Sequence, residues 1–131
     1  MRRVIIALIA MTCFSITALV QGRPQTQPST ASVGFHNQSE FSIIVKGYTV
    51  VNGVQRAGPL VHLKKGAKGF ENNVPLGTRY YSVYDANQTS RILLQDNPVP
   101  IRNSMVLLNI VPSPTNANRV TIVPVGGSPT P

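Results

Sequence analysis

The sequence predicts an all-β fold, a small antiparallel β-sandwich of about seven or eight short strands in a chain of 131 residues. Its apolar, β-branched runs are short, and Gly, Pro or Asn separates most of them, which is typical of a sandwich. No stretch after residue 22 keeps a 3.6-residue apolar period over three turns, and the eleven prolines and ten glycines also disfavour helices. An open barrel is the alternative arrangement of the same strands.

The strongest local signal is the Asn52-Gly53 pair, which lies between two apolar runs. A two-residue type I′ turn needs two residues that tolerate positive φ, and this pair supplies them. We therefore expect a hairpin whose second arm runs through Val54 towards Leu63, with Pro59 interrupting that arm or lying at an edge. The expected strands cover residues 42–51, 60–63, 79–84, 91–94, 105–111 and 119–125.

The expected strand at residues 79–84 is rich in tyrosine, so the direction of each side chain matters. Successive side chains of a strand point to opposite faces of the sheet. The sequence therefore predicts two faces, with Tyr81, Val83 and Asp85 on one and Tyr80, Ser82 and Tyr84 on the other.

The first 22 residues have the features of a secretory signal peptide. Two arginines follow the first Met, residues 4–20 are apolar and uncharged, and a polar segment begins at Gln21. We expect cleavage after Gly22, or else after Ala18, and a secreted or periplasmic protein; an uncleaved membrane anchor is the alternative. The predicted organisation is a signal peptide at 1–22, a disordered linker at 23–32, a β-sandwich domain at 33–125 and a disordered tail at 126–131.

Cysteine usage and charge limit the class of protein further. The single cysteine, Cys13, lies within the predicted signal peptide, so the mature chain is expected to be cysteine-free, which excludes a disulfide-stapled domain. After residue 22 there are ten Lys and Arg against four Asp and Glu, a net charge of +6. Basic exported proteins are attracted to anionic surfaces. We expect as partner an anionic envelope polymer, a glycan or another envelope protein, with no nucleic acid and no transmembrane span after signal cleavage.

The order of short motifs in the middle of the chain resembles a known β domain. FHNQS at 35–39 precedes a β-branched strand, and LKKG at 63–66, VPLG at 74–77, YYSVY at 80–84, DA at 85–86 and LL at 93–94 follow. This order is similar to the β domain of the von Hippel–Lindau type, so it implies a transthyretin-like sandwich, with an immunoglobulin-like one as the alternative. The resemblance implies a peptide-binding sandwich at most. The family's peptide pocket relies on a Trp, this chain has none, and Tyr81 stands near that position.

The sequence contains no signature of catalysis. It has no GxSxG elbow, the predicted mature chain has no cysteine nucleophile, and the four carboxylates lie in turn-like contexts. We therefore predict that the protein is not an enzyme. We also expect no cofactor and no metal, because zinc sites need three or four suitable ligands. The alternative is a small hydrolase-type enzyme with a site near His36 or His62.

The candidate binding surface combines a basic segment with the tyrosine-rich strand. Three lysines interrupted by glycines form a basic loop at residues 63–69, and tyrosines can stack on sugars or peptides. The alternative is a solvated turn that guards a sheet edge and tyrosines that pack in the core. The predicted ligand-binding residues are Lys64, Lys65, Lys68, Arg79, Tyr80, Tyr81 and Tyr84, and Tyr48 could add to the stacking surface.

Together these features predict an exported, non-catalytic binding or structural module of the cell envelope or extracellular space. Assembly by edge-strand addition is a third hypothesis, because β-augmentation needs only backbone groups and leaves no motif. Two N-glycosylation sequons begin at Asn37 and Asn87 and would matter in a eukaryotic secretory pathway. The Arg-Arg start and the missing disulfides fit bacterial export better.

Overall fold

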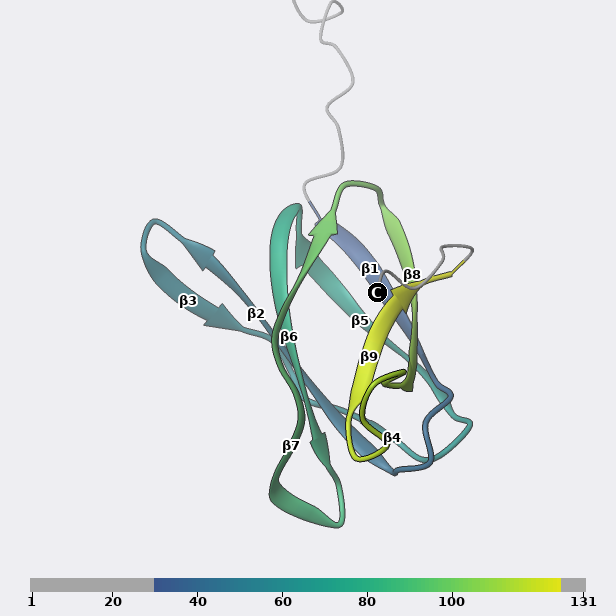
Figure 1. Ribbon diagram of the computed structural model, residues 1–131. Coiled ribbons are helices and arrows are strands. Elements are labelled where there is room, and N and C mark those ends of the chain that lie inside the picture. Colours follow the sequence, from purple (N-terminus) through teal and green to yellow (C-terminus); the bar gives the residue numbers. More distant parts are fainter. Residues whose placement is uncertain (1–29, 126–131) are drawn as a thin grey trace, which may run out of the picture.

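The computed structural model describes residues 30–125 and confirms the predicted all-β sandwich (Figure 1). The predicted signal peptide, residues 23–29 of the predicted linker and the predicted tail lie outside the described residues. No described residue belongs to a helix that could cross a membrane. The described residues form nine strands: β1 (Thr30–Asn37), β2 (Ile43–Val51), β3 (Val54–Ala57), β4 (Val61–Leu63), β5 (Lys68–Pro75), β6 (Gly77–Asp85), β7 (Gln88–Ile101), β8 (Met105–Pro112) and β9 (Val120–Pro124).

The strands form two packed sheets. Sheet A has the order β5-β1-β8-β9, and sheet B has the order β3-β2-β6-β7, with β4 also pairing with β2. All paired strands are antiparallel except β1 and β8, which run parallel. This parallel pair departs from the wholly antiparallel sandwich that the sequence predicts.

Two strands lie where the sequence predicts other structure. β1 begins at Thr30, within the range predicted as a linker, because Ala31 and Val33 alternate with polar residues and both are buried in the core. β5 begins at Lys68, at the end of the predicted basic loop. It is an edge strand in which only Glu71 and Val74 are buried, so its sequence lacks an apolar alternation.

The hairpin between β2 and β3 is confirmed. Asn52 and Gly53 have φ values of 52° and 78°, as a type I′ turn requires, and Val51 pairs with Val54 across the turn. Pro59 lies in the gap between β3 and β4 and so interrupts the second arm as predicted. Figure 1 shows this hairpin projecting from the side of the sandwich.

The core fills the space between the two sheets. Tyr81 and Val83 of β6 are fully buried, as the predicted alternation requires, while Tyr80 and Tyr84 are half-buried. Ser82 shares the side of these two tyrosines but is only 5% exposed, and its hydroxyl accepts from Asp96 N–H. Each buried Val, Ile or Leu stabilises the fold by roughly 1.5–3 kcal/mol. The core residues are Ala31, Val33, Phe35, Ile43, Val45, Leu63, Val74, Tyr81, Val83, Leu93, Val99, Ile101, Leu108, Ile110 and Val120.

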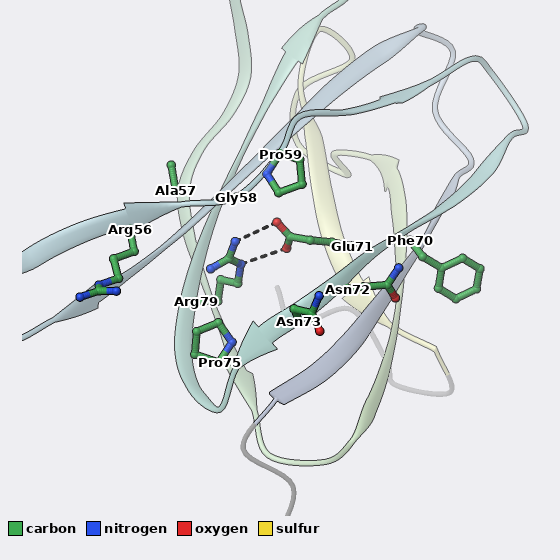
Figure 2. A pocket seen from close by; sticks show the side chains of 10 residues that line it. All are labelled: Arg56, Ala57, Gly58, Pro59, Phe70, Glu71, Asn72, Asn73, Pro75 and Arg79. Atoms are coloured by element: carbon green, nitrogen blue, oxygen red, sulfur yellow. Dashed lines mark hydrogen bonds and ion pairs between the residues drawn. The ribbon is translucent and has the colours of Figure 1, made fainter.

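A buried ion pair, here called the interlayer ion pair, joins the two sheets (Figure 2). Glu71 on β5 belongs to sheet A, and Arg79 on β6 belongs to sheet B. Arg79 donates from Nε to Glu71 Oε1 at 3.0 Å and from its Nη2 to Glu71 Oε2 at 2.8 Å, a bidentate geometry. Its remaining nitrogen donates to Thr49 Oγ1 at 2.7 Å, and Tyr81 Oη donates to Glu71 Oε1 at 2.9 Å.

Two glycines let backbone approach this ion pair closely. A Cβ atom at Gly58 would overlap the Glu71 carboxylate and Arg79 Nη2, and Gly58 N–H donates to the carbonyl of Gly47 at 2.9 Å. A Cβ atom at Gly47 would likewise lie 2.9 Å from Arg79 Nε and overlap the ring of Tyr81. The missing side chains therefore allow two stretches of backbone to cover the buried charges.

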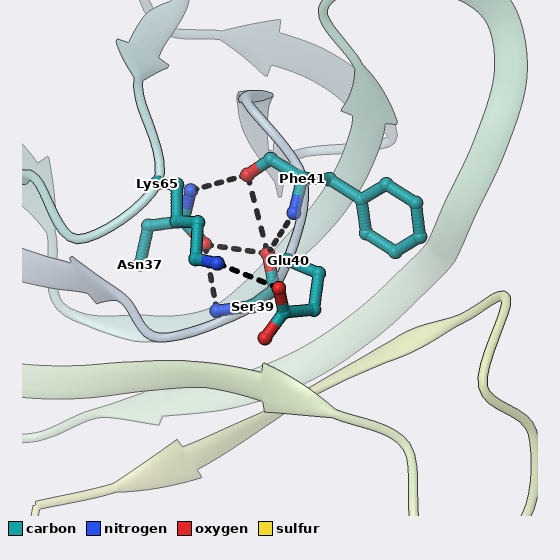
Figure 3. A network of polar contacts seen from close by, with 5 residues as sticks. All are labelled: Asn37, Ser39, Glu40, Phe41 and Lys65. Carbon is teal, nitrogen blue, oxygen red and sulfur yellow. Dashed lines mark hydrogen bonds and ion pairs between the residues drawn. The ribbon is translucent and has the colours of Figure 1, made fainter.

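A second buried polar centre is Asn37, at the end of β1 (Figure 3). Its side-chain amide donates to the carbonyls of Phe41, Leu63 and Lys64 at 2.7–3.2 Å. Its carbonyl oxygen accepts from the N–H and hydroxyl of Ser39 at 3.0 and 2.6 Å. The first sequon therefore has an asparagine side chain whose donors are fully used inside the fold.

We predict that Glu71→Gln destabilises the protein by about 3–5 kcal/mol, because it leaves the Arg79 charge buried without a counter-charge. Urea unfolding followed by circular dichroism measures this change. The matched control is Glu40→Gln, which removes the exposed pair between Glu40 and Lys65, with side chains 72% and 62% exposed. The control should cost less than about 1 kcal/mol. Equal losses in the two variants would contradict the structural role of the interlayer ion pair.

Candidate functional site

The outer face of sheet B carries a cluster of polar and aromatic side chains, here called the tyrosine face. The even-numbered residues of β2 and β6 point outward, opposite to the core residues between them. The β2–β6 register places Tyr48 beside Tyr80 and Lys46 beside Ser82, and Tyr84 lies one row further along β6. The tyrosine face consists of Lys46, Tyr48, Tyr80, Ser82, Tyr84 and Asp96.

Two of the tyrosines stack on each other. The ring centroids of Tyr48 and Tyr80 are 5.2 Å apart, and the rings are 20° from parallel. Offset stacking of this kind stabilises an aromatic pair and fixes the orientation of both rings. Both side chains are half-buried, so each ring is held by its neighbour and still contacts solvent.

Asp96 reaches this face through an irregularity in β7. It has a φ of 48°, and the β6–β7 register shifts between Tyr81 and Val83. Tyr48 Oη donates to Asp96 Oδ1 at 3.1 Å, and Asp96 N–H donates to Ser82 Oγ at 3.0 Å. Desolvation and the hydrogen bond to Asp96 raise the pKa of the Tyr48 phenol above its usual value of 10, which keeps it a neutral donor.

A shallow hollow of about 220 Å³ lies at the centre of the tyrosine face and continues onto Gln55 and Ala57 of β3. Lys46 on its wall is exposed and has no ion-pair partner among residues 30–125. The hollow therefore offers aromatic ring surface, a cationic donor and a carboxylate acceptor within one rigid sheet. Such a combination can hold a polyhydroxylated ligand by stacking and hydrogen bonds.

Two of the predicted binding residues are inside the protein. Arg79 and Tyr81 are 3% and 0% exposed, and both belong to the interlayer ion pair and its hydrogen bonds. Burial disfavours the Arg79 cation, but Glu71 more than compensates and raises the pKa of the guanidinium. Burial, followed by the neighbouring Glu71 carboxylate, strongly raises the pKa of the Tyr81 phenol. These side chains hold the sheets together rather than face solvent.

The predicted lysines do not converge with the tyrosines. Lys65 pairs with Glu40 at 2.6 Å, and Lys64 lies beside His62 in a separate hollow at the end of β4. Lys68 lies on sheet A, in register with His36 and next to a groove beneath Phe70. Of the predicted set, only Tyr80 and Tyr84 lie together on the tyrosine face. Tyr48, on the neighbouring strand β2, lies beside Tyr80 on the same face.

Two other hollows differ from the tyrosine face in chemistry. A cleft of about 490 Å³ lies between the β3–β4 connection and β5, with the interlayer ion pair as its floor (Figure 2). A groove of about 350 Å³ lies on the outer face of sheet A, where the side chains of Phe70 and Leu107 close over Gly34. The first contains the paired Glu71 and Arg79 together with Arg56, which has no ion-pair partner among residues 30–125, and the second is mainly apolar.

The histidines of the alternative hydrolase site lie in two different hollows: His36 lines the groove on sheet A, and His62 lines the hollow at the end of β4. His36 Nδ1 is 3.1 Å from Gln38 Nε2 on the surface of sheet A, and His62 is exposed on β4. Within residues 30–125, no group of three or more His, Cys, Asp or Glu side chains could hold a metal ion. Asp85, at the start of the β6–β7 turn, accepts from the N–H of Asn87 at 2.9 Å, which is the turn role that the sequence predicts.

Lys46, Ser82 and Asp96 are not among the binding residues that the sequence predicts. The alternation of β2 and β6 carries the signal for the first two, because both lie in phase with outward-facing tyrosines. Asp96 could not be placed, since its position depends on the bulge in β7.

Comparison with known proteins identifies no family for this chain. No protein-family model and no curated protein sequence matches the chain. The solved structures similar to it include an NMR structure of a protein from Eubacterium rectale, with a TM-score of 0.47 and 9% sequence identity. That match covers 78% of this chain and 94% of the other. The resemblance to the von Hippel–Lindau β domain stays a prediction.

We predict that the stability of the protein falls as the pH rises above about 10, because the unfolded chain releases the Tyr81 proton there while the folded protein retains it. The stabilisation by neutral Tyr81 is complete below the unfolded pKa and is lost as the pH approaches the raised folded pKa. Tyr81→Phe should be about 1–3 kcal/mol less stable at pH 8, through loss of the hydrogen bond to Glu71, but less sensitive to alkali.

Urea unfolding between about pH 8 and pH 11 measures both effects, since each differential proton changes stability by about 1.4 kcal/mol per pH unit. Tyr84→Phe is the matched control, because Tyr84 lies on the outer face of the same strand. Identical pH slopes for Tyr81→Phe and the control would contradict the prediction.

Proposed function

We propose that this protein is an exported, non-catalytic binding module that holds a polysaccharide of the cell envelope or extracellular space against the tyrosine face. The observation that carries the proposal is the stacked pair of Tyr48 and Tyr80 on the same sheet face as Tyr84, Lys46 and Asp96. Aromatic rings with polar groups between them suit the apolar faces and hydroxyl groups of sugars.

The spacing of the tyrosines supports an elongated ligand. Tyr80 and Tyr84 are four residues apart on β6, which corresponds to about 13 Å at the rise of a β-strand. Lys46 and Asp96 occupy the row between them and can bond to hydroxyl or anionic groups of the same chain. All of these groups lie on strands, so the surface keeps its shape without a ligand.

The basic charge of the protein supports electrostatic attraction to an anionic polymer, which is a second and weaker contribution to binding. The chain after residue 22 has a net charge of +6, and the lysines at 64, 65 and 68 are spread over other surfaces. Attraction of this kind concentrates the protein near anionic material and weakens with salt. Stacking on the tyrosines does not depend on salt, so the two contributions can be separated.

We predict that the protein co-sediments with an insoluble polysaccharide, tested with cellulose, chitin and peptidoglycan, and that binding persists in about 1 M salt. A double variant with alanine in place of both Tyr80 and Tyr84 should weaken the salt-resistant binding roughly five- to tenfold, because each substitution removes a ring that the ligand covers. The fraction of protein in the pellet measures this binding.

The matched control is the replacement of the same two tyrosines with phenylalanine, which keeps the rings and should retain most of the affinity. A triple Lys→Glu variant at positions 64, 65 and 68 should change only the salt-sensitive part. No binding to any of the polymers, or unchanged binding of the alanine variant, would sink the proposal.

A further inference from the structure

Each sheet of a sandwich ends in edge strands whose outer N–H and C=O groups have no partner strand, and such edges invite pairing with another chain. Within the described residues, β5 and β9 border sheet A, while β7 and the pair β3 and β4 border sheet B. Proteins normally protect such edges with prolines, bulges or very short strands. The protection of the four borders can therefore be compared.

Most of these borders carry a protecting feature. β7 contains Pro98 and Pro100 together with the bulge at Asp96, and β9 ends in Pro124. β5 has Asn73 in the left-handed region at a φ of 59°, a register shift against β1 and a final proline. β4 is only three residues long.

β3 is also short, at four residues, but it has none of the other features. Its four pairs with β2 follow one another without a register shift, and it contains no proline and no residue with positive φ. Val54 pairs with Val51 next to the turn, and Gly58 N–H donates to the carbonyl of Gly47. Hydrogen-bonded and non-hydrogen-bonded pairs alternate along an antiparallel ladder, so these two contacts determine which backbone groups of β3 bond to β2. Residues 54, 56 and 58 therefore bond to β2, whereas the N–H and C=O groups of Gln55 and Ala57 point to the open edge.

The position of the hairpin leaves this edge accessible. β3 is exposed along its whole length, and the β2–β3 hairpin projects away from the body of the sandwich (Figure 1). Val54 is 59% exposed and Val50 is 48% exposed, so apolar side chains near the tip are uncovered on both faces of the hairpin. A two-stranded hairpin gains stability from a third strand that pairs with it and covers such side chains.

We propose that the open edge of β3 binds an extended, acidic peptide segment of another protein as an additional strand of sheet B. The backbone groups of Gln55 and Ala57 form the new hydrogen bonds, and the alternating side chains of the segment select the partner. On the face that carries Val54 and Arg56, the segment places an apolar residue beside the valine and a carboxylate beside the arginine. These two residues of the segment are two positions apart.

Charge selects an acidic partner over a second copy of this chain. Arg56 is exposed and has no ion-pair partner among residues 30–125, so it is free to pair with a carboxylate. In an antiparallel β3–β3 pair that uses the free groups of both Gln55 and Ala57, Arg56 lies directly opposite its own copy. Like charges at this position destabilise the pair, and the net charge of +6 after residue 22 adds to the repulsion.

The test uses short synthetic peptides and NMR of the isotopically labelled protein. The probes are seven-residue peptides of Ser and Thr that contain a Val and a Glu two positions apart, in both orders. Addition of a probe should shift the amide signals of Gln55 and Ala57 and slow their hydrogen exchange. The amide of Arg56 should change less, because it already bonds to β2. Absence of protection at Gln55 and Ala57 would overturn the proposal.

Variants separate strand addition from other modes of binding. Gln55→Pro removes a free N–H without breaking a bond to β2 and should weaken binding at least about tenfold. Arg56→Glu should weaken binding of the Glu probe and favour a probe with Lys in its place, a charge swap that does not depend on the stability of the proline variant. Leu107→Ala should leave the affinity unchanged, because Leu107 lies on β8 of sheet A and not on sheet B.

Three results would contradict the proposal. The first is equal affinity of the Glu and Lys probes for the unaltered protein. The second is a set of shifted signals confined to the tyrosine face. The third is concentration-dependent protection of Gln55 and Ala57 without any peptide, which would assign the edge to self-association.

Discussion

The bidentate pair between Glu71 and Arg79 is the constraint on which the arrangement of the two sheets depends. Both side chains are nearly inaccessible to solvent, and they come from opposite sheets. Sliding one sheet over the other would separate the two charges inside the core, which costs several kcal/mol. Burial of apolar side chains is non-directional, so an apolar interface fixes the relative position of two sheets less strictly than a bidentate ion pair does. The pair therefore selects one relative position of the sheets.

This constraint also decides which side chains of β6 reach the surface. Arg79 and Tyr81 must face inward to reach Glu71, so the residues between and beyond them, Tyr80, Ser82 and Tyr84, must face outward. The tyrosine face is thus the reverse side of the interlayer ion pair on the same strand. Its geometry depends on the core as much as on its own hydrogen bonds.

The sequence predicts local features such as turns and strand faces, whereas it does not predict which distant segments pair or pack together. The Asn52-Gly53 turn and the two faces of β6 follow from backbone preference and alternation, and both are confirmed. Two strands are not predicted, because β1 begins in a linker-like composition and β5 has a polar sequence. These two strands pair with each other in the fold. Likewise, the sequence groups the tyrosines of one strand but does not show that Arg79 and Tyr81 donate hydrogen bonds to Glu71 inside the fold.

β2 connects the core to both proposed binding surfaces. Its odd-numbered residues face inward, where Thr49 accepts from Arg79, and its even-numbered residues face outward, where Tyr48 stacks on Tyr80. The C-terminal end of β2, next to the Asn52-Gly53 turn, forms the hairpin with β3. A slip of one residue would move Tyr48 into the core and deprive Arg79 of Thr49, so the buried charge opposes any change of register. The interlayer ion pair, although nearly inaccessible to solvent, therefore keeps both the tyrosine face and the open edge of β3 in place.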